Sequence, residues 1–271
     1  CRTAGLRTRL FTSPHLIRAN ERIRIDFQPV TDERFIDLAG RLRDATDGMD
    51  PHPTFFELVL AMALLHFRDE SVDVVILETG MGGRLDATSA VLPTATAITR
   101  IGLDHTHWLG DTLPEIALEK AGILKPGIPL ALAPQDEGAG GAILGRAAEL
   151  GCPVTRVASM PVDTDLGIPG PHQLENAAVA VELVSSSGIR LDGEQIRRGI
   201  ADARWPARFQ VVELPGREHP VVIDAAHNPD SAQVLAATWR EEFPGVRPVL
   251  LFAGMDKKDT PGTFGPLVGI A

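Results

Sequence analysis

Apolar residues along the chain follow two alternating spacings, one typical of helices and one typical of strands. Phe35, Leu38, Ala39 and Leu42 recur at helical spacing, and Thr31 is available as an N-cap. Short apolar runs bounded by polar residues, the pattern of central parallel strands, cover 72–78, 95–101, 128–133 and 153–157. Further helices are predicted at 54–67, 114–122, 142–150, 173–185 and 194–203. This alternation predicts an α/β fold whose parallel sheet is covered on both faces.

The same rhythm restarts after Trp205-Pro-Ala-Arg208. Apolar runs predict strands at 209–214, 221–224 and 249–253, and an amphipathic stretch predicts a helix at 230–243. We therefore expect a boundary near Arg204, with one domain over 1–204 and a smaller, Rossmann-like α/β domain over 205–271. The second is small for a doubly wound unit, and the chain opens on Cys1 without methionine. Both domains are thus expected to be incomplete, the first at its start and the second at its end.

Composition narrows the class of function. A formal net charge of −10 argues against broad nucleic-acid binding, which requires a basic face, although a local cluster of Arg and Lys can still bind a small anion. No apolar stretch approaches the roughly 20 residues that span a bilayer. Two cysteines are too few for a disulfide framework or a zinc site. We expect a cytoplasmic enzyme with small-molecule substrates, no nucleic-acid or membrane partner, and a monomeric state.

Polar clusters follow three of the predicted strands, at the ends where parallel sheets bind ligands. Glu78 precedes a Gly-rich turn, Asp104-His105 follows the next strand, and Asp224 is followed by His227 and Asn228. A carboxylate and a histidine on adjacent strand ends suit a divalent cation. Taken singly, Glu78 could be a capping or salt-bridged carboxylate, and His105 a structural histidine.

Two further features are ambiguous. The loop Gly80-Met-Gly-Gly83 matches neither the phosphate-loop nor the dinucleotide motif, and its glycines could simply allow a tight turn. No segment of the 271 residues matches the phosphate-loop motif. Lys120 lies on a mainly apolar helical turn, from which a lysine usually extends to solvent. Alternatively, Lys120 is a functional amine whose pKa is lowered by desolvation.

Taken together, the motifs resemble the folylpolyglutamate synthase and dihydrofolate synthase family, a relative of the Mur ligases, in sequence and in order. They span nearly the whole chain: Phe11-Thr-Ser-Pro-His-Leu16, Glu21-Arg-Ile23, Thr54-Phe-Phe-Glu57, Leu77-Glu-Thr-Gly-Met-Gly-Gly-Arg-Leu-Asp-Ala-Thr88, Asp104-His105, Leu109-Gly-Asp-Thr112, Glu119-Lys-Ala-Gly-Ile123, His172-Gln173, Asn176-Ala177, Trp205-Pro-Ala-Arg208, Asp224-Ala-Ala-His-Asn-Pro229, Gly254-Met255 and Asp256-Lys-Lys-Asp259. The resemblance implies a Mur-ligase-like ATP-binding domain followed by a glutamate-ligase domain.

It also implies a chemistry. ATP phosphorylates a carboxylate of folate or dihydropteroate, and the amino group of L-glutamate attacks the acyl phosphate, with Mg²⁺ neutralising the phosphates. The residues that match the family's pattern are Ser13, Glu78 and His105 for the metal; Lys120, as a carbamylated lysine beside a second Mg²⁺, and His105 for catalysis; Thr54, Phe55, Phe56, Glu57, Leu85, Asp86 and Ala87 for the pterin substrate; and Asn176, Arg208, Asp224 and His227 for the nucleotide. Ser13 could equally be an N-cap before Pro14, and His227 could make a structural hydrogen bond.

Departures from the family leave alternatives open. The family's phosphate loop would precede Cys1, which predicts that residues 1–271 alone do not turn over ATP. Ala207 stands where the family usually has Gly, and Ser89 where it has Asn. Another Mur-type amino-acid ligase is the alternative enzyme, although Thr54-Phe-Phe-Glu57 argues against it. A non-catalytic remnant that binds a pterin or a partner protein is the alternative outside enzymes.

Overall fold

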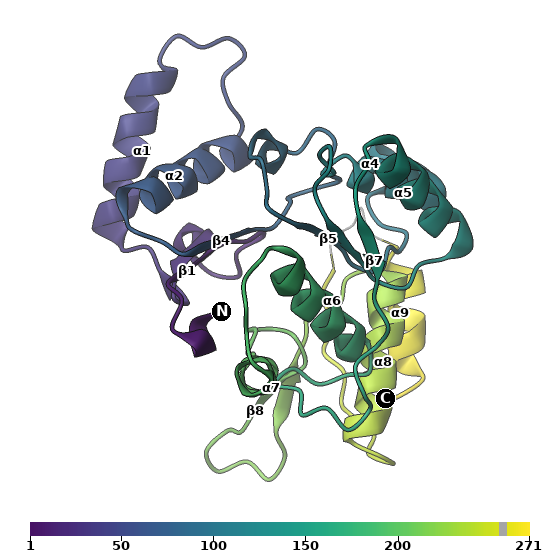
Figure 1. The fold of residues 1–271 in the computed structure, drawn as a ribbon. Coiled ribbons are helices and arrows are strands. Elements are labelled where there is room, and N and C mark those ends of the chain that lie inside the picture. Colours follow the sequence, from purple (N-terminus) through teal and green to yellow (C-terminus); the bar gives the residue numbers. More distant parts are fainter. Residues whose placement is uncertain (255–258) are drawn as a thin grey trace.

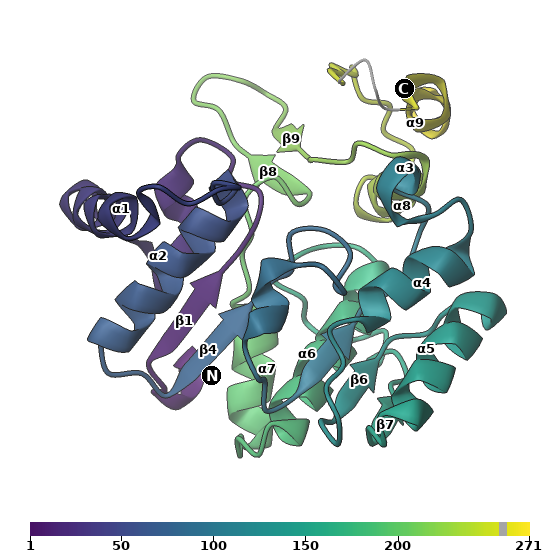
Figure 2. The same cartoon turned by 90° about the horizontal axis from the view of Figure 1, so that it is seen from above.

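A computed structural model describes residues 1–254 and 259–271 and shows an α/β architecture (Figures 1 and 2). The strands are β1 (Thr8–Phe11), β2 (Ile23–Ile25), β3 (Gln28–Pro29), β4 (Val74–Leu77), β5 (Thr96–Ile98), β6 (Leu130–Leu132), β7 (Val154–Arg156), β8 (Gln210–Val212) and β9 (Val221–Ile223). The helices are α1 (Asp32–Thr46), α2 (Phe55–Asp69), α3 (Thr106–Leu109), α4 (Leu113–Ala121), α5 (Glu137–Glu149), α6 (His172–Ser186), α7 (Gly193–Ala201), α8 (Pro229–Glu242) and α9 (Thr260–Val268). Residues 255–258 of the predicted motif at 254–259 lie outside the described part.

The first sheet has the order β3-β2-β1-β4. Strand β1 pairs parallel with β4 and antiparallel with β2, so the carboxyl ends of β1 and β4 lie side by side. Helices α1 and α2 cover one face, with Phe11, Leu38 and Val59 in the shared core. The predicted Thr31 cap is present, since the Thr31 hydroxyl accepts from the Arg34 amide. The Thr54 hydroxyl caps α2 in the same way by accepting from the Glu57 amide, which was not predicted. The antiparallel pairing of β1 with β2 was not predicted.

The second sheet, β5-β6-β7, is parallel and is covered on both faces as predicted. Leu130 and Leu132 of β6 pack with residues of α4 and α5, whereas Ala131 packs with Val179 of α6. Figure 1 shows α4 and α5 on one side of this sheet and α6 on the other. Strand β4 departs from the prediction. It is not paired with β5 within the described residues, and Val75 and Ile76 remain 42% and 39% exposed.

The C-terminal segment, residues 205–271, contains β8 and β9 as an antiparallel pair, followed by α8 and α9 packed on each other. The described residues of this segment therefore contain no parallel strand pair. The strand predicted at 249–253 is wrong, because these residues have no strand structure and Val249 and Leu251 are almost fully exposed. An apolar run alone cannot form a strand without a neighbouring strand to satisfy its backbone.

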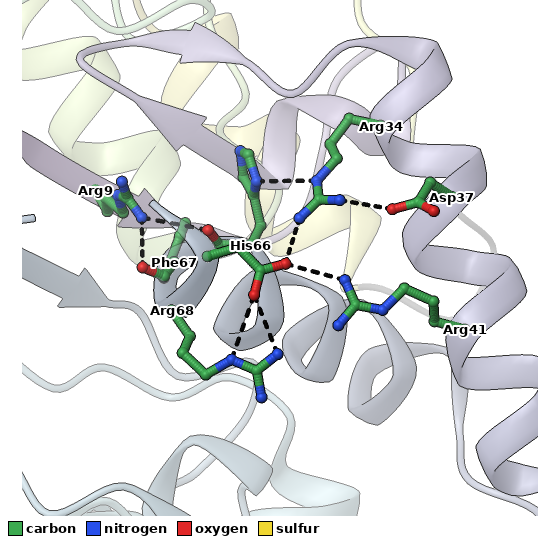
Figure 3. Close-up of polar contacts among 8 residues, drawn as sticks. Arg9, Arg34, Asp37, Arg41, His66, Phe67 and Arg68 are labelled. Carbon is green, nitrogen blue, oxygen red and sulfur yellow. Dashed lines mark hydrogen bonds and ion pairs between the residues drawn. The ribbon is translucent and has the colours of Figure 1, made fainter. Parts of the chain in front are cut away.

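The C-terminal end of α2 is held by a cluster of charged groups (Figure 3). The Arg9 guanidinium of β1 is fully buried and donates to the backbone oxygens of Phe67 at 2.6 Å, His66 at 3.4 Å and Ser71 at 3.3 Å. These are the carbonyls that a helix end leaves without partners, so Arg9 ties β1 to the end of α2. This contact was not predicted.

Asp69 at the same helix end accepts from three arginines: Arg41 at 3.0 Å, Arg68 at 3.0 Å and Arg34. These hydrogen bonds hold the pKa of the Asp69 carboxyl well below its usual range. A lowered folded-state pKa gives stability that is present above the unfolded pKa of about 4 and is lost as pH falls towards the folded pKa.

We therefore expect Asp69→Asn to lower the stability of the protein at pH 7. The difference from the parent should shrink as pH falls below about 4, because the parent carboxylate then begins to protonate in the unfolded chain. Urea unfolding at pH 7 and at pH 3 measures this. Asp44→Asn is the control, since Asp44 pairs with its exposed sequence neighbour Arg43. A constant difference at both pH values would contradict the expectation.

Candidate functional site

Ser13 and Glu78 meet at the adjacent carboxyl ends of β1 and β4. The Ser13 amide donates to Glu78 Oε2 at 2.9 Å. Burial raises the pKa of the Glu78 carboxyl, and the Ser13 amide and the charges of Arg208 and Arg22 oppose that rise. Ser13 does not cap a helix in the described chain, because the next helical turn, Ala19–Arg22, has Arg18 as its N-cap. The N-cap alternative for Ser13 is therefore wrong.

Arg22 is a buried cation of this strand end that the sequence reasoning did not assign. Its Nε donates to His15 Nδ1 at 3.0 Å, and its guanidinium lies 5.3 Å from the centre of the Phe55 ring. Its charge acts on Glu78 as well. Arg22 thus connects the candidate metal ligands with the first candidate substrate segment.

The loop Gly80–Gly83 is organised by Asp86. Its Oδ2 accepts from the amides of Gly80 at 2.7 Å and Met81 at 3.0 Å, and its Oδ1 accepts from Thr88. Gly82 adopts φ 67°, a conformation that favours glycine. The alternative that these glycines serve a tight turn thus has a direct structural basis, and Asp86 holds that turn.

The two candidate substrate segments adjoin this loop. Thr54 and Glu57 form the capping box of α2, and the Phe56 ring packs so closely on Gly80 that a Cβ there would lie 2.6 Å from it. Ala87 packs against the core of the first sheet. Phe55 and Leu85 keep exposed apolar side chains, at 54% and 81%, and are available to a ligand. The structure thus gives Thr54, Phe56, Glu57, Asp86 and Ala87 local structural contacts of their own.

Lys120 lies near the end of α4, where the helix meets the Gly80–Gly83 loop. Burial lowers the pKa of the Lys120 amine, and the nearby Asp104 carboxylate opposes that effect. The Arg84 amide donates to the Glu119 carbonyl at 2.8 Å, and the Arg84 side chain pairs with the Glu119 carboxylate. Lys120 is therefore partly removed from solvent at a fixed point beside the loop.

Gly122 sets this close approach, because a Cβ on it would lie 2.2 Å from Arg84 Cα. We expect Gly122→Ala to destabilise the protein by about 1–3 kcal/mol, since backbone must move to admit the methyl group. Urea unfolding measures the change. Gly141→Ala in α5 is the control, because nothing lies within 4 Å of its Cβ position and the substitution favours a helix. Equal stability of the two variants would show that the approach is not tight.

Asp104 connects the end of β5 to the C-terminal segment. Its Oδ1 accepts from the His105 amide at 2.8 Å, and its Oδ2 lies 2.9 Å from Asn228 Nδ2 and 3.3 Å from His227 Nε2. His105 is the N-cap of α3 with φ 52°, a conformation that non-glycine residues adopt at a cost and that clusters at functional sites. His227 Nδ1 also contacts the Ala225 carbonyl at 2.9 Å, so the structural hydrogen bond considered for His227 is present.

A pocket of about 270 Å³ lies between α6 and α8. Asn176, Arg208 and Asp224, three of the four candidate nucleotide residues, line it together with His172, Gln173, Ser231, Val234 and Thr238 among others. Asp224 also accepts from the amides of Phe209 at 2.7 Å and Ala226 at 2.8 Å, so both its oxygens are fixed. His227 does not line this pocket.

Two details of the pocket were outside the sequence reasoning. His172 Nδ1 is buried and has no hydrogen-bond partner in the described chain, which leaves a polar atom at the pocket for a ligand. Arg208 lies between Ala207 at φ 55° and Phe209 at φ 44°, so a strained turn presents its side chain. The positive φ of residue 207 also explains why glycine suits this position.

The candidate metal ligands form two groups. Ser13 contacts Glu78, whereas His105 contacts Asp104. Within the described residues, no three His, Cys, Asp or Glu side chains gather as a metal site. Magnesium is compatible with this, because it keeps several waters and usually takes only one or two carboxylates besides phosphate oxygens.

Comparisons with known proteins show what the whole chain is similar to. No family model matches the chain. It is 34% identical over 288 residues to a Bacillus subtilis dihydrofolate synthase/folylpolyglutamate synthase, covering 94% of this chain and 66% of that protein. Escherichia coli FolC in complex with DHPP and ADP superposes with a TM-score of 0.90 at 31% identity, over 100% of this chain and 67% of that one. A bifunctional folylpolyglutamate synthase/dihydrofolate synthase with Mn, AMPPNP and L-glutamate bound gives a TM-score of 0.86 at 34% identity. This match covers 100% of this chain and 68% of that one.

The parallel α/β sheet with polar groups at its strand ends places the protein in the Mur-ligase-like class of folds. Within that class, the chain belongs to the folylpolyglutamate synthase/dihydrofolate synthase family. It spans 66% of the length of its Bacillus subtilis relative.

Proposed function

We propose that the protein joins L-glutamate to folate or dihydropteroate in an ATP-dependent reaction. The observation that carries the proposal is the pocket in which Asn176, Arg208 and Asp224 come together from α6, the turn after Arg204 and the end of β9. Arg208 also acts electrostatically on Glu78, so the pocket adjoins the strand ends that carry the other candidate groups. Solved structures similar to this chain hold ADP in one case, and AMPPNP with L-glutamate in another.

The reaction explains why such groups are needed. A carboxylate is a poor electrophile, and phosphorylation by ATP turns one of its oxygens into a leaving group. The amino group of glutamate then attacks the acyl carbon, forming the amide and releasing phosphate. In our proposal the pocket holds the nucleotide, His227 supports it from the start of α8, and the segments 54–57 and 85–87 hold the pterin part through Phe55 and Leu85.

We propose that Ser13, Glu78 and His105 hold Mg²⁺. The donors fit the ion, because Glu78 is a carboxylate at a strand end with two cationic side chains nearby to offset its burial. Bound Mg²⁺ would neutralise the phosphates and the charge that develops on them. Lys120, with its amine partly desolvated, is proposed to carry a carbamate that holds a second Mg²⁺.

Further expectations belong to the same proposal. The division into domains at about Arg204, the monomeric state, the absence of nucleic-acid and membrane partners and a cytoplasmic location stay predictions. Within the described residues, no helix is both long and apolar enough to cross a bilayer. Cys1 and Cys152 are both free thiols.

The test is product formation by the protein at its natural length. We expect ADP release that requires Mg²⁺, L-glutamate and either folate or dihydropteroate, and a product whose mass has increased by one glutamyl unit. Residues 1–271 alone, which contain no phosphate loop, are expected to give no turnover. Turnover with a cell-wall precursor instead would favour another Mur-type ligase. Binding of a pterin without any ADP release would favour a non-catalytic protein.

A further inference from the structure

Two segments more than a hundred residues apart meet through the Asp104 carboxylate. Asp104 follows β5, and its Oδ2 accepts from Asn228 Nδ2 at 2.9 Å and lies 3.3 Å from His227 Nε2. Both partners precede α8 in the C-terminal segment. An ionised carboxylate that bonds a side chain so distant in sequence specifies how the two parts dock, because its geometry is directional.

The backbone beside Asp104 makes the same contact. The Leu103 amide donates to Asp230 Oδ2 at 3.2 Å. A Cβ on Gly102 would lie 2.2 Å from that same oxygen, so a side chain at position 102 would turn the Asp230 carboxylate away from this contact. Residues 102–104 thus dock on residues 227–230 through three successive positions.

Asn228 connects this contact to α8. It is the N-cap of that helix, and its Oδ1 accepts from the Ser231 amide at 2.8 Å. Its side-chain amide is therefore held at both ends, by Asp104 and by the helix. Ser231 and Val234 of the same helix line the pocket, so a shift at Asp104 would move a pocket wall.

The opposite side of Asp104 leads to His105. Asp104 Oδ1 accepts from the His105 amide at 2.8 Å, and His105 holds a strained φ of 52° as the N-cap of α3. A residue in this conformation needs support from its surroundings. The single Asp104 carboxylate therefore supports both His105 and the start of α8.

We infer that Asp104 is a positioning residue that locks the start of α8 onto the strand end carrying His105, and so couples occupancy of the pocket to the geometry of His105. The part concerning the nucleotide rests on the proposed function. The contact itself does not, and the two can be tested separately.

The first test uses Asn228→Asp. Aspartate caps helices as well as asparagine does, so α8 keeps its cap, but two carboxylates now face each other across the contact. We expect faster hydrogen exchange at the Leu103 amide by mass spectrometry. Combining Asn228→Asp with Asp104→Asn reverses the donor and acceptor and should return exchange to the parent rate. This readout does not depend on any enzymatic activity.

The second test is calorimetric titration with ADP of the same variants at natural length. We expect Asn228→Asp to raise the dissociation constant about tenfold, and the double variant to lie within about twofold of the parent, because the pair is coupled. Asp111→Ala, in the loop after α3, is the control and should bind ADP as the parent does.

A double variant that is no better than Asn228→Asp in either measurement would overturn the inference. Restored exchange with ADP affinity unchanged in all variants would overturn the coupling to the pocket. If the parent did not bind ADP, the proposed function would fail at the pocket, and the exchange measurement would still decide whether Asp104 locks α8.

Discussion

Replacing Lys120 by alanine is expected to lower ligase turnover about a hundredfold or more, the loss typical when one preorganised group that stabilises the transition state is removed. The proposed role of Lys120 is to become a carbamate that holds magnesium. An alanine at this position offers neither the carbamate nor a substitute. The loss should appear in kcat, because the candidate substrate segments at 54–57 and 85–87 are not altered.

The environment of Lys120 explains why carbamate formation is feasible there. Only a neutral amine attacks carbon dioxide, and burial lowers the pKa of this amine, so more of it is neutral at a given pH. Asp104 opposes this effect. Since the neutral fraction rises with pH, carbamate formation should also rise with pH. Gly83 and Gly122 keep the end of α4 against the loop, which fixes where the carbamate would stand.

Two measurements check this role. Turnover of Lys120→Ala should recover in part when a short carboxylic acid is added, because the added carboxylate can take the place of the carbamate. In ¹³C NMR with labelled bicarbonate, the parent should show a carbamate signal that Lys120→Ala lacks. Lys125→Ala is the matched control and should retain both turnover and signal. Full activity of Lys120→Ala would exclude the proposed role.

Most elements of the first 204 residues could be predicted from the spacing of apolar residues. The helices α2, α4 and α6 lie at or within about two residues of the prediction, because their apolar faces and caps are local features. β1 and β2 were missed. Arg9 and Arg24 interrupt their apolar runs, and Arg9 is buried only because the end of α2 supplies carbonyl partners. Such a partner cannot be seen in a local pattern.

The strand predicted at 249–253 shows the opposite error. Its alternating apolar residues Val249 and Leu251 fit a strand, but strand formation depends on hydrogen bonds from a neighbour, which the described chain does not provide. Sequence pattern reports the tendency of a segment, whereas the partner is a property of the fold.

The sequence predicts a set of candidate site residues, and it does not predict their geometry. Strand ends and family motifs indicated Glu78, His105 and Asp224. The pocket brings together residues from α6, the turn around Arg208 and α8, and no spacing along the chain predicts that meeting. Asp104 and His172 lie in recognised motifs, but the sequence assigned no role to either. Asp104 contacts Asn228 and His172 lines the pocket, and both of these are long-range features of the fold.

Glu78→Gln is expected to raise the Mg²⁺ concentration that supports half-maximal turnover by roughly tenfold to a hundredfold. Glutamine keeps the size of the side chain and can still accept from the Ser13 amide, but it lacks the charge that attracts a divalent cation. The nearby Arg22 and Arg208 would then repel the ion without a compensating carboxylate. Glu70→Gln, which removes a surface pair with Arg7, is the control and should leave the Mg²⁺ dependence unchanged.

The same titration decides whether Glu78 and His105 share one ion. If both hold the same Mg²⁺, His105→Ala should also raise the half-maximal Mg²⁺ concentration. In the double variant, this concentration should rise by less than the product of the two single increases, because the second substitution acts on a site already weakened. Isothermal titration with Mn²⁺ in the presence of AMPPNP measures the affinity directly, apart from turnover. Two outcomes would show that the two strand ends do not form one metal site: strictly multiplicative effects, or a His105→Ala variant with the metal affinity of the parent. His105 would then be a residue that supports α3.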